Sequence, residues 1–284
     1  MANLSNYLSL IKFSHTVFAL PFAVIGFFLA TQQYKIDWLT FLLVIACMVL
    51  ARSAAMAFNR YIDRDIDLKN PRTATVREIP NGTIQAKFVL LFVIISSIGF
   101  IISTFFINSL CFKLSPIALI VILVYSYTKR FTAWCHLVLG IGLSLSPLGA
   151  YLALSNQFDV EPLFFSTAVL FWVAGFDIIY SLQDEAFDSK NNLKSIPVFL
   201  GIKKAMLLSK VLHSISFLSL LMAGFYIELG LFYWIGLFVF SSLLIYQHLI
   251  IFENDLSRVN LSFFTTNGIA SVIFGVFVVL ELLI

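Results

Sequence analysis

Long apolar stretches separated by short polar joins dominate this sequence. The apolar runs are about 20 residues long and show no alternation of apolar and polar positions, which favours membrane-spanning helices over barrel strands. A helix satisfies its own backbone hydrogen bonds, as a chain in lipid requires. The pattern predicts an all-α integral membrane bundle of about nine spans, roughly at residues 13–30, 38–58, 86–107, 110–127, 134–154, 161–182, 205–226, 230–251 and 262–284.

Composition agrees with lipid as the main solvent. Of the 284 residues, 60% are hydrophobic and only 12% are charged, whereas soluble domains carry about 25% charged residues. The net charge of +3 is small and not gathered on one face, so we expect no nucleic-acid partner. The first apolar run lacks a small-residue cleavage site, which favours a first helix over a signal peptide. No linker divides the chain, so we expect one transmembrane domain over residues 1–284.

The distribution of basic residues predicts an orientation. Only Lys35 and Lys113 of the 18 Lys and Arg residues fall on one side of the predicted bundle. The positive-inside rule therefore places the other side, and the N-terminus, in the cytoplasm.

Two charged joins on the cytoplasmic side have similar sequences. Asn59, Asp63 and Asp67 are spaced i, i+4, i+8, and Asp184 and Asp188 repeat the spacing. On a helix, this spacing places the side chains along one face. An Ile-Pro pair and a Gly follow each motif, and four spans lie between the two copies. An even number of spans gives both copies the same direction, so we predict a parallel internal repeat around a central cavity.

These carboxylates are suited to divalent cations. A face of unbalanced carboxylates repels itself, and Mg²⁺ binds one or two carboxylates together with substrate phosphates. A single Asp-x-x-x-Asp is most simply a solvated helix end. Two copies at the same membrane face favour a functional site, in which both motifs hold Mg²⁺ around a diphosphate.

Two ionisable residues lie deeper in the predicted helices. Asp177 shares a helical face with Asp184 and Asp188, and Arg52 precedes Asn59 by seven residues. Ionisable groups within a membrane are candidates for function. Arg52 and Asp177 either bind a substrate or neutralise each other as a structural pair, and the sequence leaves both open.

Several basic residues are candidate partners for a diphosphate. Arg and Lys commonly bind phosphate groups, and Arg72, Lys129, Arg130 and Lys194 lie on the predicted cytoplasmic side. Topology alone also explains basic residues there. His15, at the cytoplasmic end of the first span, is a candidate to border the cavity, and the other three histidines are expected to be packed or interfacial.

These motifs resemble those of the UbiA superfamily of intramembrane prenyltransferases. The segment from Asn59 to Gly82 resembles the superfamily's first motif, with its following Arg-Thr-Ala stretch and Pro-x-Gly turn, and Asp184 to Asp188 resembles the second. The flanking residues look closest to the bacterial 4-hydroxybenzoate polyprenyltransferase-like branch, which includes enzymes for ubiquinone and for the futalosine route to menaquinone. Many members have Asn-Asp where this chain has Asn59-Arg60.

The resemblance implies a nine-helix bundle with a lateral opening to lipid, in the inner membrane. It implies Mg²⁺-dependent transfer of a polyprenyl group from a polyprenyl diphosphate to an aromatic acid, 4-hydroxybenzoate or a related hydroxynaphthoate. Asp63, Asp67, Asp184 and Asp188 would be the metal-binding and catalytic residues, with Asn59 at the diphosphate. Haem, chlorophyll or a glycerol-lipid headgroup are alternative acceptors, although Arg52 favours a carboxylate. A membrane transporter is the less favoured alternative, because its charges would lie near the midplane.

Overall fold

The computed structural model describes residues 4–12 and 18–284, and the described residues form helices without a β-strand. The α-helices are α1 (Leu4–Leu10), α2 (Leu20–Ala30), α3 (Trp38–Ile62), α4 (Arg64–Lys69), α5 (Ala86–Ile107), α6 (Ser109–Thr128), α7 (Cys135–Ser155), α8 (Glu161–Ser181), α9 (Glu185–Lys190), α10 (Ile196–Leu200), α11 (Ile202–Tyr226), α12 (Leu231–Leu249) and α13 (Asn267–Leu283). A 3₁₀ turn, η2 (Leu182–Asp184), and a π-helical segment, η3 (Leu261–Thr266), precede α9 and α13.

Eight of these helical segments are long and apolar enough to cross a membrane, and they match eight of the nine predicted spans. The all-α membrane bundle is therefore confirmed. The predicted span 13–30 is only partly described: α2 begins at Leu20 and has 11 residues, while residues 13–17 lie outside the described residues. Eleven helical residues extend about 16 Å, roughly half of the hydrocarbon thickness.

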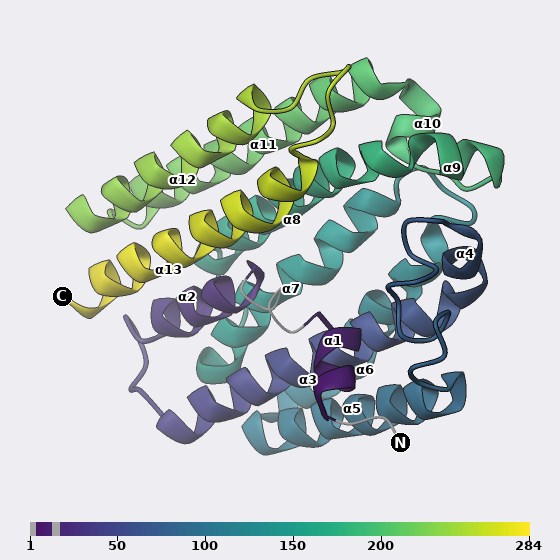
Figure 1. The fold of residues 1–284 in the computed structure, drawn as a ribbon. Coiled ribbons are helices and arrows are strands. Elements are labelled where there is room, and N and C mark those ends of the chain that lie inside the picture. Colours follow the sequence, from purple (N-terminus) through teal and green to yellow (C-terminus); the bar gives the residue numbers. More distant parts are fainter. Residues whose placement is uncertain (1–3, 13–17) are drawn as a thin grey trace.

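The helices form two groups that α2 and α7 join (Figure 1). In one group α8 packs on α11 and α12 packs on α13, and in the other α3, α5 and α6 pack together. Small residues permit the closest contacts: a Cβ on Gly26 of α2 would lie 2.1 Å from the Pro147 carbonyl oxygen of α7. Close backbone approach of this kind is typical of membrane helix interfaces.

An aromatic core stabilises the junction of these groups. Phe22 of α2 lies 5.4 Å from Trp172 of α8 and 5.9 Å from Phe274 of α13, measured between ring centroids, and all three side chains are buried. Aromatic pairs at such distances contribute beyond their buried area. These contacts pack α8 and α13 against α2 at the junction.

Both acidic motifs lie where a long helix is interrupted, at the end of the bundle that carries α4, α9 and α10 (Figure 1). The α3 helix ends at Ile62, Asp63 caps it, and α4 begins at Arg64. The α8 helix passes through η2 before α9 begins. This corrects the expectation of one continuous helical face at each motif. The backbone bond from Asp67 N–H to the Asp63 carbonyl, 2.7 Å, keeps one helical turn across the first break.

Candidate active site

The two acidic motifs line one cavity of about 260 Å³, which we call the polar cavity. One wall comes from α3 and α4 and the facing wall from α8, η2 and α9. The predicted residues brought together here are Asn59, Asp63, Asp67, Asp184 and Asp188. Residues 117 to 129 positions apart thus share one site, as the predicted repeat requires.

The loop that follows α4 neutralises carboxylates of both motifs. Arg72 forms a bidentate ion pair with Asp184, in which Nε lies 3.1 Å from Oδ1. The Asn70 amide donates to the same oxygen at 3.2 Å. Arg77 pairs with Asp67 of the first motif. This loop therefore links the two halves of the site electrostatically. Of these three residues only Arg72 is a predicted diphosphate partner, although all three lie in the segment that carries the first motif.

The join between α6 and α7 supplies two further cations. Lys129 Nζ lies 2.8 Å from Oδ1 of the fully buried Asp188, whose Oδ2 has no hydrogen-bond partner among the described residues. Arg130 lies 3.6 Å from the Asp63 carboxylate and 3.1 Å from that of Asp65. A buried carboxylate with an unsatisfied oxygen is costly, so Asp188 is suited to a further cationic or hydrogen-donating ligand.

The electrostatics of the first motif favour added positive charge. Burial, followed by repulsion from the Asp67 carboxylate, raises the pKa of Asp63 to about 6. Asn59 donates a hydrogen bond to Asp63 at 3.0 Å and so fixes the orientation of this carboxylate. Arg60, which follows Asn59 directly, is buried and lines the same cavity.

One predicted residue, Lys194, is not brought to the site, and a second falls outside the part of the chain that the structure describes. The Lys194 side chain is exposed and does not line the polar cavity, and only its backbone N–H reaches the Lys129 carbonyl, at 2.8 Å. His15 lies outside the described residues. The prediction of a diphosphate role for Lys194 therefore has no geometric support.

Deeper in the polar cavity, Asp177 pairs with His136 and not with Arg52. The His136 Nδ1 lies 2.6 Å from Asp177 Oδ2. Arg52 has no ion pair with any described carboxylate, and its Nε has no hydrogen-bond partner among the described residues. The alternative of a structural Arg52–Asp177 pair is therefore wrong. The expectation of a merely packed or interfacial His136 missed this contact, which joins residues 41 positions apart and leaves no local pattern.

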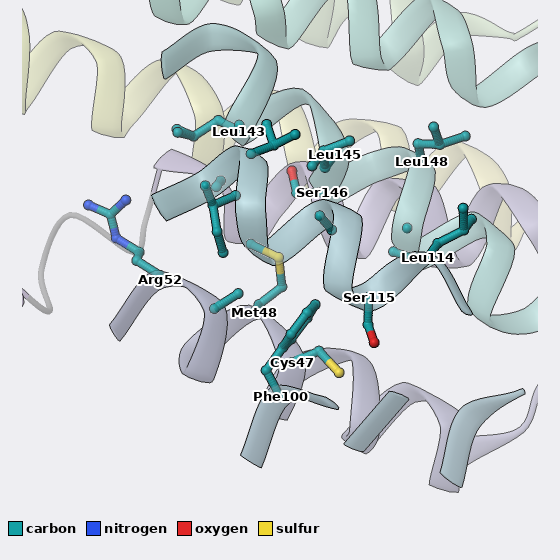
Figure 2. A pocket seen from close by; sticks show the side chains of 18 of the residues that line it. Cys47, Met48, Arg52, Phe100, Leu114, Ser115, Leu143, Leu145, Ser146 and Leu148 are labelled. Carbon is teal, nitrogen blue, oxygen red and sulfur yellow. The ribbon is translucent and has the colours of Figure 1, made fainter. Parts of the chain in front are cut away.

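A second cavity of about 350 Å³, the apolar cavity, adjoins the first. Side chains of α3, α5, α6 and α7 line it (Figure 2), and they are mostly aliphatic, with Arg52 at one end and Met48, Leu114 and Leu148 farther inside. The two cavities share five lining residues: Arg52, Met56, Tyr125, Leu139 and Leu143. A ligand with a charged head and a greasy tail could occupy both.

The described residues contain no group of three or more His, Cys, Asp or Glu side chains arranged to hold a metal unaided. The motif carboxylates are instead distributed around the polar cavity and paired with basic residues. Mg²⁺ usually takes only one or two carboxylates, and phosphate oxygens and water complete its coordination. The oxygen donors here fit a hard cation that binds together with a phosphate ligand.

Comparison with known proteins agrees with this architecture. The sequence model of the UbiA prenyltransferase family matches residues 19–269. Over 186 residues the chain is 30% identical to 4-hydroxybenzoate octaprenyltransferase of Francisella tularensis subsp. novicida, a match that covers 66% of this chain and 65% of that protein. The corresponding enzyme of Shewanella sp. is 28% identical over 186 residues, with 66% and 64% covered. The chain therefore spans somewhat less than two thirds of these relatives.

Solved structures are similar over more of the chain. An apo UbiA homologue from Aeropyrum pernix superposes with a TM-score of 0.85 at 31% identity, covering 94% of this chain and 98% of that one. A UbiA homologue from Archaeoglobus fulgidus bound to DMAPP and Mg²⁺ has a TM-score of 0.75 at 19% identity, covering 98% and 99%. The latter likeness supports the fold alone.

Proposed function

Since the chain belongs to the UbiA prenyltransferase family, we propose that it transfers a polyprenyl group from a polyprenyl diphosphate to an aromatic acid. The acceptor we propose is 4-hydroxybenzoate or a related hydroxynaphthoate, in quinone biosynthesis. The observation that carries the proposal is the junction of two unlike cavities, one lined by paired acidic motifs and the other by aliphatic side chains. A polyprenyl diphosphate has this same division into an anionic head and an apolar tail.

The polar cavity would bind the diphosphate. Arg72, Arg77, Lys129 and Arg130 already point their cationic groups at the motif carboxylates. We infer that the diphosphate oxygens take over some of these contacts, while Asp63, Asp67, Asp184 and Asp188 hold Mg²⁺. When bound, Mg²⁺ neutralises the charge that develops on the departing diphosphate. The Archaeoglobus fulgidus homologue, which shares the fold, is bound to DMAPP and Mg²⁺, the same two classes of ligand that we propose here.

The junction residues would position the acceptor. Arg52 lies at the boundary of both cavities and has an unpaired guanidinium Nε, so it suits the carboxylate of an aromatic acid. The allylic C1–O bond breaks with its electron pair on the diphosphate. A ring carbon supplies the pair for the new C–C bond and then loses its proton. Aliphatic side chains such as Leu139 and Leu143 exclude water that would otherwise capture the cation.

The proposed site would face the cytoplasm of a bacterial inner membrane. The basic residues that line the polar cavity lie at the same end as α4, α9 and α10, opposite Lys35 and Lys113. The positive-inside rule then supports a cytoplasmic diphosphate site. Mg²⁺ would reach the site from the cytoplasm, and the released inorganic diphosphate would leave to it, while the prenyl tail stays in the membrane.

A direct assay tests the proposal. Membranes that contain the protein receive Mg²⁺, a labelled polyprenyl diphosphate, and in turn 4-hydroxybenzoate, dihydroxynaphthoates or haem. We expect a labelled product with an aromatic acid and none in excess EDTA. If product formed with haem alone, the proposed acceptor would be contradicted. If activity in EDTA were full, the proposed metal would be contradicted.

A further inference from the structure

His136 is held from two sides in a way that defines its hydrogen-bonding state. It lies near the start of α7, is 3% exposed, and its Nδ1 contacts Asp177 Oδ2 at 2.6 Å. On the other side of the ring, the backbone N–H of Ile196 approaches Nε2 at 3.3 Å. Because a backbone N–H can only donate, Nε2 accepts there, which places the ring proton on Nδ1, facing Asp177.

This contact connects the second motif's loop to the deeper part of the polar cavity. Ile196 begins α10 directly after Ser195, whose hydroxyl caps that helix by accepting from the Val198 N–H. The Ile196 N–H is therefore rigidly placed. The loop after the second motif thus sets the ring orientation, and the ring in turn holds one oxygen of Asp177.

The other oxygen of Asp177 is available to a ligand. The Asp177 side chain lines the polar cavity and is 23% exposed. Its Oδ1 accepts no hydrogen bond from the described residues, whereas Oδ2 is occupied by His136. A carboxylate oriented through one oxygen presents the second in a defined direction.

Arg52 and Asp177 lie at corresponding depths in the two halves of the site. Arg52 precedes Asn59 by seven residues on α3, and Asp177 precedes Asp184 by seven on α8 and η2. Seven helical residues correspond to about 10 Å. An unpaired cation and an oriented carboxylate therefore line the same cavity about 10 Å below the two motifs. An aromatic acid with a hydroxyl group across the ring would satisfy both, with its acid at Arg52 and its hydroxyl at Asp177.

We propose that His136 is a positioning residue that holds Asp177 to accept a hydrogen bond from a ring hydroxyl of the acceptor. The inference rests on the proposed function and adds to it the residues that recognise the ring hydroxyl of the acceptor. The hydrogen bond to Asp177 raises electron density at the ring carbon beside the hydroxyl. That carbon bonds to C1 of the prenyl group as the C1–O bond breaks, and its own proton passes to an oxygen of the released diphosphate.

A ligand-hydroxyl comparison tests this role without relying on catalysis. Binding of 4-hydroxybenzoate and of benzoate, which lacks the hydroxyl, is measured by calorimetry on the purified full chain and its variants. In the unmodified protein we expect 4-hydroxybenzoate to bind about tenfold more tightly than benzoate, as for a hydrogen bond to a charged group. We call the affinity for 4-hydroxybenzoate divided by that for benzoate the hydroxyl ratio. His136→Ala should remove most of this ratio and leave benzoate binding unchanged.

Conservative variants separate positioning from folding. Asparagine places its amide nitrogen near the position of His Nδ1, so His136→Asn should restore most of the hydroxyl ratio, whereas His136→Gln should not. Asp177→Ala should remove the ratio as well. His248→Ala is a matched control, because this half-buried histidine lines neither cavity. Melting temperatures of all variants are compared in parallel.

Three outcomes would overturn the proposal in distinguishable ways. A hydroxyl ratio that survives in His136→Ala would show that His136 does not act on the hydroxyl. Equal loss of benzoate and 4-hydroxybenzoate binding would indicate a structural role only. If the unmodified protein bound neither compound, the aromatic acid acceptor itself would be wrong, and the role of His136 would fall with it.

Discussion

In the polar cavity the carboxylates of both motifs have basic partners, whereas the apolar cavity is lined mostly by aliphatic side chains and by no carboxylate. Asp188 is fully buried yet paired with Lys129 at 2.8 Å. At the boundary between the cavities, Arg52 lacks any carboxylate partner among the described residues. Breaking one half of a buried ion pair leaves an uncompensated charge. A ligand that binds in the polar cavity must therefore replace the charged partners that it displaces. An anion that binds Arg52 at the boundary displaces no such partner.

The polar cavity lies at one end of the bundle, and we expect this end to face the cytoplasm. Cysteine labelling tests this orientation with an all-or-none outcome. Single cysteines are introduced at Lys69, Lys190 and Gln157, which are all exposed. An impermeant reagent applied to intact cells should label the Gln157→Cys variant only, because the basic end is expected in the cytoplasm. The unmodified chain, with Cys47, Cys111 and Cys135, is the background control. Labelling at position 69 or 190 would contradict a cytoplasmic diphosphate site.

Removal of one motif carboxylate should give the largest catalytic effect. Asp63→Ala or Asp184→Ala should lower prenyl transfer on the order of 10²-fold or more, comparable to loss of a single preorganised electrostatic group. Asp65→Ala is the matched control, because its side chain is 60% exposed and does not line the polar cavity. Turnover is measured in Mg²⁺, with protein yield as the folding check. Near-normal turnover in either motif variant would exclude the proposed metal role.

Loss of the unpaired cation should affect the acceptor selectively. Arg52→Ala should raise the KM for the aromatic acid about tenfold or more, since one charge-assisted contact is worth about 1.5–3 kcal/mol. The KM for the prenyl diphosphate should change little, and Arg52→Lys should recover part of the loss. Steady-state kinetics with each substrate varied in turn provide the measurement. An equal rise in both KM values would place Arg52 at the diphosphate instead.

The sequence predicted the features that depend on local pattern. Eight spans follow from hydropathy, and the shared end of the two motifs follows from the number of spans between them. Arg72, Lys129 and Arg130 were predicted to lie at this end from the distribution of basic residues, and the structure places them near motif carboxylates. The ion-pair partner of each carboxylate could not be predicted from the sequence, because it depends on tertiary contacts. Asp177 pairs with a histidine on another helix, and Arg77 pairs with Asp67 across a loop.

The interruptions of α3 and α8 could also not be predicted from the sequence pattern. Residues around Asp63 carry no Pro or Gly that would signal an interruption, yet α3 ends at Ile62. The loop from Asn70 to Gly82 must fold back over the cavity for Arg72 to reach Asp184, and this contact holds the segment from outside the helix. The spacing expected for one continuous helix therefore predicted correctly which residues line the site, but it predicted an uninterrupted helix where the structure has a break.

The smallest expected effect concerns the apolar cavity, where filling space should discriminate between prenyl chains. Gly149 of α7 lines this cavity, and a Cβ at this position would have no heavy atom within 4 Å. Gly149→Phe therefore fits without a clash at its Cβ and occupies room that a long prenyl tail would need. We expect a several-fold rise in the KM of a long polyprenyl diphosphate and little change for a short one, because one displaced methylene costs about 0.8 kcal/mol, which is about fourfold in affinity. Ile98→Phe is the control, since this half-exposed α5 residue carries the same ring outside the cavity. Competition between a long and a short diphosphate in one reaction gives the ratio directly, and an unchanged ratio would mean that the prenyl tail lies elsewhere.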